Sequence, residues 1–209
     1  MKRLIWIVAL IVVALPLAAF ANSGVVIDFD NAQSSLTGGT NNLTLTGAPI
    51  IGVQNWPGLS PLITGNNLGS MAFSLPTTSL TSGGLDQNHA TFGPGGTFSI
   101  TLNGGQGLPN GLVFNGSFVF ANWSLISCTG SNCFYSFTGQ ISGSWMNKST
   151  ATADFTWEIE SVGGKYNGQN GILKSGNTTF TVVPEPGTLG LLGTGLLGLA
   201  GVLRRKISA

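Results

Sequence analysis

Apolar and polar residues alternate along most of the chain between residues 25 and 183. A period of two is typical of strands with one buried and one solvated face, because successive side chains of a strand point to opposite sides. Clusters of Gly, Asn and Pro separate the alternating segments, and no stretch between them has a helical period. The clearest alternating segments are 25–30, 43–46, 97–102, 135–145, 154–160 and 180–182.

This pattern predicts an all-β domain, an antiparallel β-sandwich of jelly-roll-like form with roughly eight to ten strands. Residues 47–92 alternate less regularly, and long loops are expected there. Between residues 112 and 125 the apolar positions change from even to odd numbers. A β-bulge near Ala121 and Asn122 would turn the later side chains back toward the core. The apolar residues concerned are Leu112, Phe114, Phe118 and Phe120, followed by Trp123 and Leu125.

The beginning of the chain has the order of a secretory signal peptide. A short basic start is followed by an apolar run over residues 4–17 and by the small residues Ala19 and Ala21. This order predicts a signal peptide over residues 1–21, with cleavage after Ala21. The alternative is an uncleaved N-terminal anchor, but the apolar run is shorter than the roughly 20 residues of a stable span.

The end of the chain has the opposite polarity. Pro184, Glu185 and Pro186 precede an uncharged stretch over 187–203, which as a helix would be about 25 Å long. A basic tip follows, and such clusters favour the cytoplasmic side of a membrane. We therefore expect a C-terminal transmembrane helix with the body outside, although a buried core helix is the alternative. The tip consists of Arg204, Arg205 and Lys206.

Together, the Pro-Glu-Pro motif, the Gly/Leu-rich span and the basic tip resemble the PEP-CTERM sorting signal. The resemblance implies processing near the motif by an exosortase, a membrane-embedded cysteine transpeptidase-like enzyme. It also implies a Gram-negative host that makes exopolysaccharide. The expected organisation is a signal peptide at 1–21, an extracellular β-domain at 22–183 and the sorting signal at 184–206. The precursor would be tethered to the inner membrane, and the product would lie at the cell surface or outside the cell.

The charge of the body excludes one class of partner. Residues 22–183 contain six acidic side chains, three lysines and no arginine, which gives a net charge of −3. A nucleic-acid-binding domain needs a basic face to neutralise phosphates, so we expect no nucleic-acid partner. The weak charge and the abundance of Ser, Thr and Asn suit an extracellular β-domain.

Cys128 and Cys133 are the two cysteines of the chain, and a Gly- and Asn-containing turn lies between them. In an exported protein, this spacing predicts a disulfide that closes a hairpin. A metal site is disfavoured because there is no second Cys pair and His89 is the single histidine. Asp86 lies near His89, but no Gly-x-Ser-x-Gly elbow supplies a nucleophile, and His89 is expected on a surface loop.

Two carboxylate pairs are candidates for chemistry. Asp28 and Asp30 share a strand face and could ligate Ca²⁺, but the sequence indicates none of the further oxygen ligands that this ion needs. Glu158 and Glu160, with Asp154, line one face of a strand at a spacing of about 6.5–7 Å. Glycosidases use carboxylates at such distances across a cleft. Because nothing indicates a cleft, we interpret both pairs as exposed polar faces and predict no catalytic residue, metal or cofactor.

Four tryptophans in the body could stack on sugar rings. Trp123, Trp145 and Trp157 alternate with other inward residues and are predicted to lie in the core. Trp56, which precedes a proline in an irregular region, is the candidate for exposure. The leading hypothesis is a non-enzymatic surface or matrix protein associated with exopolysaccharide. The alternatives are a carbohydrate-binding or adhesin module with a groove around Trp56, and a hydrolase with two convergent carboxylates.

Overall fold

The computed structural model describes residues 25–147 and 149–183, which contain eleven strands and two short 3₁₀ helices. The expected signal peptide at 1–21 and sorting signal at 184–206 lie outside the described residues. The elements are β1 (Val25–Asn31), β2 (Ser34–Thr37), β3 (Leu43–Gln54), β4 (Leu62–Leu75), η1 (Thr77–Ser79), β5 (Leu80–Gly83), β6 (His89–Phe92), β7 (Gly95–Asn103), η2 (Gly105–Gly107), β8 (Asn110–Thr129), β9 (Asn132–Trp145), β10 (Ser149–Val162) and β11 (Gly171–Val183).

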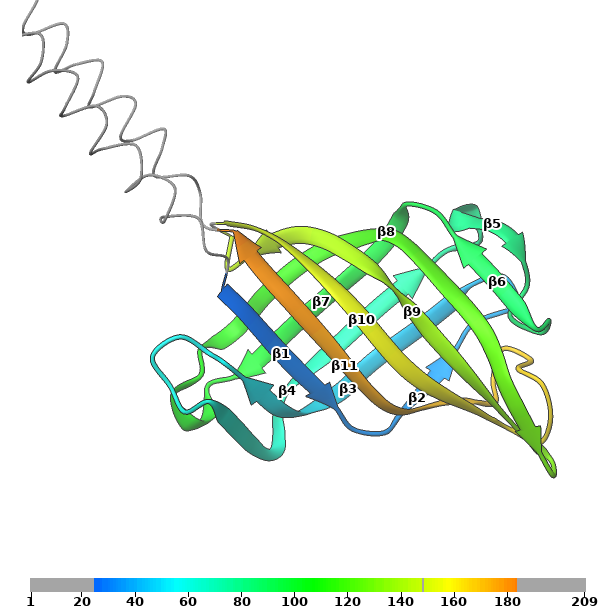
Figure 1. Cartoon of the computed structure of the whole chain (residues 1–209), viewed down its shortest axis with the longest axis horizontal. Coiled ribbons are helices and arrows are strands. Elements are labelled where there is room, and N and C mark those ends of the chain that lie inside the picture. Colours follow the sequence, from blue (N-terminus) through cyan, green and yellow to red (C-terminus); the bar gives the residue numbers. More distant parts are fainter. Residues whose placement is uncertain (1–24, 148, 184–209) are drawn as a thin grey trace, which may run out of the picture. The chain divides into compact units, whose positions relative to one another are not determined.

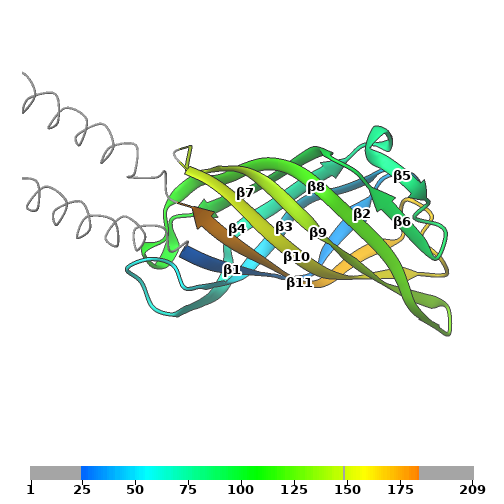
Figure 2. The same ribbon diagram turned by 45° about the horizontal axis from the view of Figure 1, so that its top comes forward.

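The strands form one antiparallel sheet that closes on itself. The main path runs β8-β7-β4-β3-β1-β11-β10-β9, and β9 then pairs with β8 again. These eight strands follow the order of the chain around a cylinder, as Figures 1 and 2 show. The short strand β2 bridges β3 and β11, while β5 and β6 extend from the edge of β8.

The all-β antiparallel class is confirmed, but the arrangement differs from the expected jelly roll. Opposite walls of the cylinder face each other across the core like the layers of a sandwich, yet hydrogen bonds continue around the whole sheet. The alternation cannot distinguish the two arrangements, because both give each strand one apolar face. Residues 47–92 are also more regular than expected, since β4 runs for 14 residues within them.

Aromatic rings fill much of the interior of the cylinder. Trp157 on β10 stacks on Phe73 of β4 across the core, with ring centroids 5.1 Å apart. Trp157 also donates a hydrogen bond from Nε1 to Thr178 Oγ1 at 3.2 Å. Trp123, Trp145 and Trp157 are buried, which confirms their predicted core positions.

Closure of the cylinder depends on close approach between β8 and β9. Gly116 and Gly143 are directly paired across this seam. A Cβ atom at Gly143 would lie 2.3 Å from the carbonyl oxygen of Asn115, so a larger residue would push the two strands apart. Sequence alternation alone did not indicate this seam.

In β8, the change from even-numbered to odd-numbered inward residues occurs earlier along the chain than predicted. Register shifts lie between Phe118 and Phe120 and between Leu125 and Ser127, instead of at Ala121–Asn122. The first shift turns Phe120 outward, where 43% of its surface is exposed, and restores the inward direction at Ala121 and Trp123. A bulge commonly re-aims one side chain in this way. Leu112 also faces solvent, contrary to the even-numbered pattern.

The predicted disulfide between Cys128 and Cys133 is confirmed. The two cysteines are directly paired at the tip of the β8–β9 hairpin, whose turn contains Gly130 with a φ of 61°. Glycine at the first central position of a two-residue turn fits the type II′ geometry that connects twisted strands.

Breaking this disulfide should have a modest effect. In the loop-closure model, a bridge across so short a loop stabilises the folded state by about 2 kcal/mol. We expect the double variant Cys128→Ser, Cys133→Ser to stay folded and to lose no more than about this amount in urea unfolding. Two free thiols in the oxidised, exported protein would contradict the structure, and mass spectrometry distinguishes the two forms by two hydrogens.

Candidate functional site

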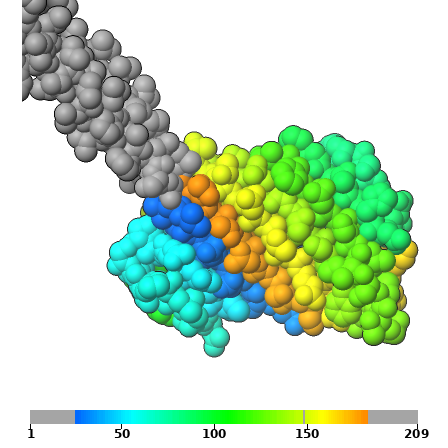
Figure 3. Space-filling view, viewed as in Figure 1, coloured from blue at the N-terminus to red at the C-terminus, as the bar shows by residue number. Residues whose placement is uncertain are grey.

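Most outward side chains of β8, β9 and β10 are uncharged and polar, and we call this surface the polar face; Asp154 and Glu158 are its exposed acidic residues. Cross-strand pairing aligns these side chains in rows. Because directly opposed side chains lie about 4.5–5.5 Å apart, each row presents neighbouring hydroxyl and amide groups. The strands that carry it lie side by side in the space-filling view of Figure 3. The rows are Asn115–Ser144–Thr150, Ser117–Ser142–Thr152 and Asn122–Thr138–Thr156.

Phe120 lies in the middle of the polar face. It is paired with Gln140, which in turn is paired with Asp154 on β10. Gln140 Nε2 donates a hydrogen bond to Asp154 Oδ1 at 3.1 Å, which orients the amide next to the aromatic ring. An exposed ring among hydrogen-bonding groups combines an apolar platform with polar contacts. Sequence reasoning missed this residue, although the adjacent apolar pair Val119–Phe120 interrupts the alternation and was the available signal.

A polar hollow of about 480 Å³ continues from the polar face across β10 toward β11 and β1. Thr156 and Glu158 belong to both the face and the hollow, and Asp30 lines the far wall. The structure therefore brings together Asp30 and Glu158, one residue from each of the two predicted carboxylate pairs. The sequence could not indicate this neighbourhood, because it depends on the order of strands around the cylinder.

Asp30 is held by two amide side chains. Gln54 Nε2 donates to Asp30 Oδ2, and Asn177 Nδ2 donates to Asp30 Oδ1, both at 3.2 Å. These bonds orient the carboxylate across three neighbouring strands. Within 25–147 and 149–183, no third acidic ligand for Ca²⁺ joins Asp28 and Asp30, since no cluster of three or more His, Cys, Asp or Glu side chains there could hold a metal ion.

The prediction that Glu158 and Glu160 are both exposed is wrong. Glu158 is exposed, but Glu160 is only 9% exposed because two partners cover it. Lys174 Nζ lies 2.8 Å from Glu160 Oε2, and Asn132 Nδ2 donates to Glu160 Oε1 at 2.7 Å. The hydrogen bond from Lys174 lowers the pKa of Glu160, so this carboxylate stays ionised and forms an ion pair with Lys174.

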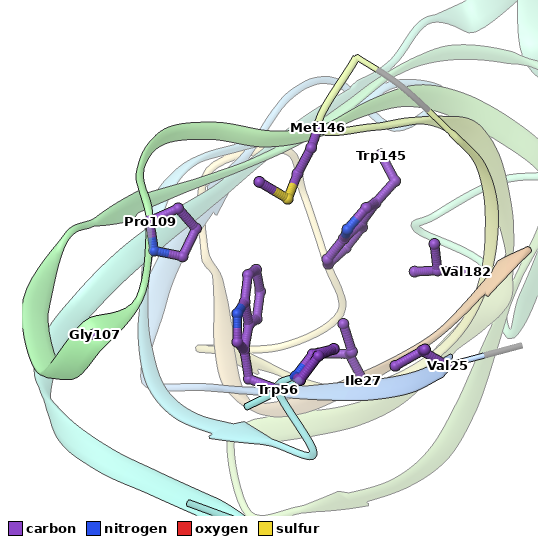
Figure 4. Close-up of a pocket in the computed structure, with 9 residues that line it drawn as sticks. Val25, Ile27, Trp56, Gly107, Pro109, Trp145, Met146 and Val182 are labelled. Carbon is purple, nitrogen blue, oxygen red and sulfur yellow. The ribbon is translucent and has the colours of Figure 1, made fainter. Parts of the chain in front are cut away.

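A second, apolar hollow lies at the end of the cylinder where β1 begins and β11 ends; we call it the end pocket. Its volume is about 410 Å³. The half-buried Trp56 packs against the buried Trp145, with ring centroids 5.7 Å apart. Figure 4 shows both rings facing the hollow, with Val25, Met146 and Val182 around them. Trp56 is therefore partly exposed, as predicted, and it lines an apolar pocket.

Tyr135 and Tyr166 are titratable residues with a structural role. Burial raises the pKa of Tyr135, and it raises the pKa of Tyr166 to about 12. These rings pack with Trp123, and Tyr135 accepts a hydrogen bond from the backbone N–H of Tyr166. Their phenols stay protonated at neutral pH. His89 is exposed at the start of β6, not in the predicted loop.

These features define a class: an all-β domain with a closed sheet, an oxidised hairpin and a weakly charged polar exterior. Residues 182–206 match the family model of the PEP-CTERM protein-sorting motif. No curated protein and no solved structure matches the chain. The chain is a PEP-CTERM-containing protein, which confirms the resemblance of Pro184-Glu185-Pro186 and the residues that follow.

The sorting motif makes this protein an exosortase substrate that is exported to the cell envelope or surface. Within the described residues, no helix is both long and apolar enough to cross a membrane. The predicted transmembrane segment at 187–203 and the signal cleavage site at Ala19 and Ala21 stay predictions, because both lie outside those residues.

Proposed function

We propose that this protein is a non-enzymatic surface protein that holds exopolysaccharide on its polar face. The observation that carries the proposal is the exposed ring of Phe120 among rows of uncharged hydroxyl and amide groups. Sugar rings present apolar C–H faces and many hydroxyls, so they need an apolar platform together with hydrogen-bonding partners. The polar face supplies both on one surface.

The hollow beside the polar face extends the binding surface. Asp30 accepts two hydrogen bonds from neighbouring amides, and each carboxylate oxygen has further capacity to accept from a sugar hydroxyl. Glu158 and Thr156 connect this hollow to the row that begins at Asn122. A polysaccharide chain could therefore follow the surface from β8 across β10 to β1.

The same contacts favour binding over hydrolysis. A glycosidase needs one carboxyl group with a raised pKa that acts as general acid. Glu160 has a lowered pKa and is paired with Lys174. Two amide donors engage Asp30 and orient its carboxylate. These features support a role in contact with polysaccharide and not in its turnover.

Replacing Phe120 should weaken polysaccharide binding. We expect Phe120→Ala to reduce the affinity for the host's exopolysaccharide about three- to tenfold, the scale of an aromatic stacking contact. Cosedimentation of residues 22–183 with the purified polymer measures this. Leu62→Ala is the matched control, because Leu62 is a similarly exposed apolar residue on β4, outside the polar face, 53% exposed against 43%.

Two results would contradict the proposal. Equal losses in Phe120→Ala and Leu62→Ala would show that the polymer does not recognise the polar face. Release of soluble sugar by the parent protein, abolished in Glu158→Gln, would identify a hydrolase instead. A glycan array with the same domain would identify the preferred sugar.

A further inference from the structure

The end pocket differs from the polar face in chemistry. Its lining contains two aromatic rings, aliphatic side chains and a methionine, and no charged residue. Small-molecule sites are concave, mostly apolar and about 300–1,000 Å³ in volume, and the end pocket falls within this range. The few polar atoms of its lining suit an apolar group better than a sugar ring.

Exposed amide residues are next in sequence to three of the residues that line the end pocket. Trp56, Gly107 and Met146 each have an exposed amide residue as a sequence neighbour: Asn55, Gln106 and Asn147. All three amides have positive φ angles of 55–58°, which are typical of residues in tight turns. Gln106 Nε2 donates to the carbonyl of Thr64, so its turn is fixed to β4.

From the apolar lining we propose that the end pocket binds the apolar chain of a single-chain amphiphile, whose polar head stays in solvent at the mouth. A wholly apolar molecule would leave its outer end against water, and a wholly polar one would place polar groups against an apolar lining. An amphiphile matches both zones. Met146 at the mouth has a flexible side chain that can adapt to chains of different shape.

The proposal does not depend on the polar face. The two sites lie on different parts of the cylinder and share no lining residue. It also does not depend on sorting, since the lining residues that the structure describes all lie between Val25 and Val182. Residues 22–183 therefore contain these lining residues and are suitable for the test.

The test uses n-decyl maltoside below its critical micelle concentration, with titration calorimetry and tryptophan fluorescence as readouts. We expect saturable binding of one molecule per domain, and no matching signal from maltose alone. Shortening the chain by two carbons should weaken binding about tenfold, because two methylenes leave the apolar environment. Equal binding of maltose and decyl maltoside would overturn the proposal.

Two adjacent residues of β1 provide a matched pair of variants. Val25 lines the end pocket, whereas Val26 points outward and is 44% exposed. Val25→Trp should fill the pocket and weaken decyl maltoside binding at least tenfold. Val26→Trp adds the same ring on the opposite face and should change the affinity less than twofold. Binding by folded Val25→Trp at parental strength would overturn the proposal.

Met146→Asp keeps the test decisive if Val25→Trp fails to fold. Met146 is 40% exposed and has a φ of 49°, a conformation that aspartate tolerates better than methionine. The new carboxylate lies at the mouth and opposes an apolar chain without disturbing the core. Unchanged decyl maltoside affinity in this variant would place the amphiphile elsewhere and overturn the assignment.

Discussion

Replacing Pro184, Glu185 and Pro186 together with alanine should leave export intact and block removal of the sorting tail. From the sequence, we expect the two prolines to favour an extended conformation, because the residue before a proline avoids the helical region and proline has no N–H to donate. Glu185 would then be presented on a short extended stretch that an exosortase can bind. Alanines remove both the restriction and the charge. Cell fractionation with antibody detection should show the uncleaved variant in the inner membrane.

A control for this variant changes prolines outside the tail. Pro61 and Pro94 are exposed in the β-domain, and Pro61→Ala, Pro94→Ala should be processed like the parent. The basic tip, Arg204-Arg205-Lys206, should stay attached only in the motif variant, which mass spectrometry can detect. If the motif variant matured as efficiently as the parent, the segment would act as a plain anchor and not as a processed sorting signal.

Removing the side chain of Trp157 should cause the largest loss of stability in the β-domain. Trp157 stacks on Phe73 and lies close to Phe155, with ring centroids 5.1 and 4.4 Å away. Trp157→Ala would leave a cavity where the opposite walls of the cylinder meet. The expected loss is about 3–5 kcal/mol in the free energy of unfolding. Equilibrium urea unfolding of residues 22–183 measures it.

Trp157→Phe separates packing from hydrogen bonding. It retains most of the aromatic volume but removes the Nε1 donor to the buried Thr178 hydroxyl. We expect a smaller loss, about 1–3 kcal/mol, since one buried acceptor loses its partner. Equal stability of Trp157→Ala and the parent would mean that the core does not depend on contact between the two walls.

Much of the local structure followed from the sequence. Alternation placed Ile27, Phe29, Phe137 and Trp157 on inward faces, and all four are buried. The pairing of Cys128 with Cys133 followed from a turn-forming sequence between two strands. These predictions succeed because the period of a strand and the chemistry of a tight turn are local properties.

Predictions failed where a local pattern had more than one spatial solution. Phe120 was placed inward with its even-numbered neighbours, but a bulge one residue earlier turns it to solvent. Glu160 was placed beside Glu158 in solvent, but Lys174 from β11 and Asn132 from β9 cover it. Both outcomes depend on the register of neighbouring strands, which a single strand does not encode.

The sequence by itself determined that the protein is sorted by a PEP-CTERM tail and that its body is an antiparallel β-domain with an aromatic core and one disulfide. Sorting signals and strand periodicity are contiguous in the chain, so a linear pattern contains them. Only the tertiary structure decided that β9 closes the sheet against β8, that Phe120 lies within a polar face, and that Asp30 and Glu158 share a hollow. These features join residues far apart in the chain, and they arise because the strands must wrap around one core until every long edge is paired.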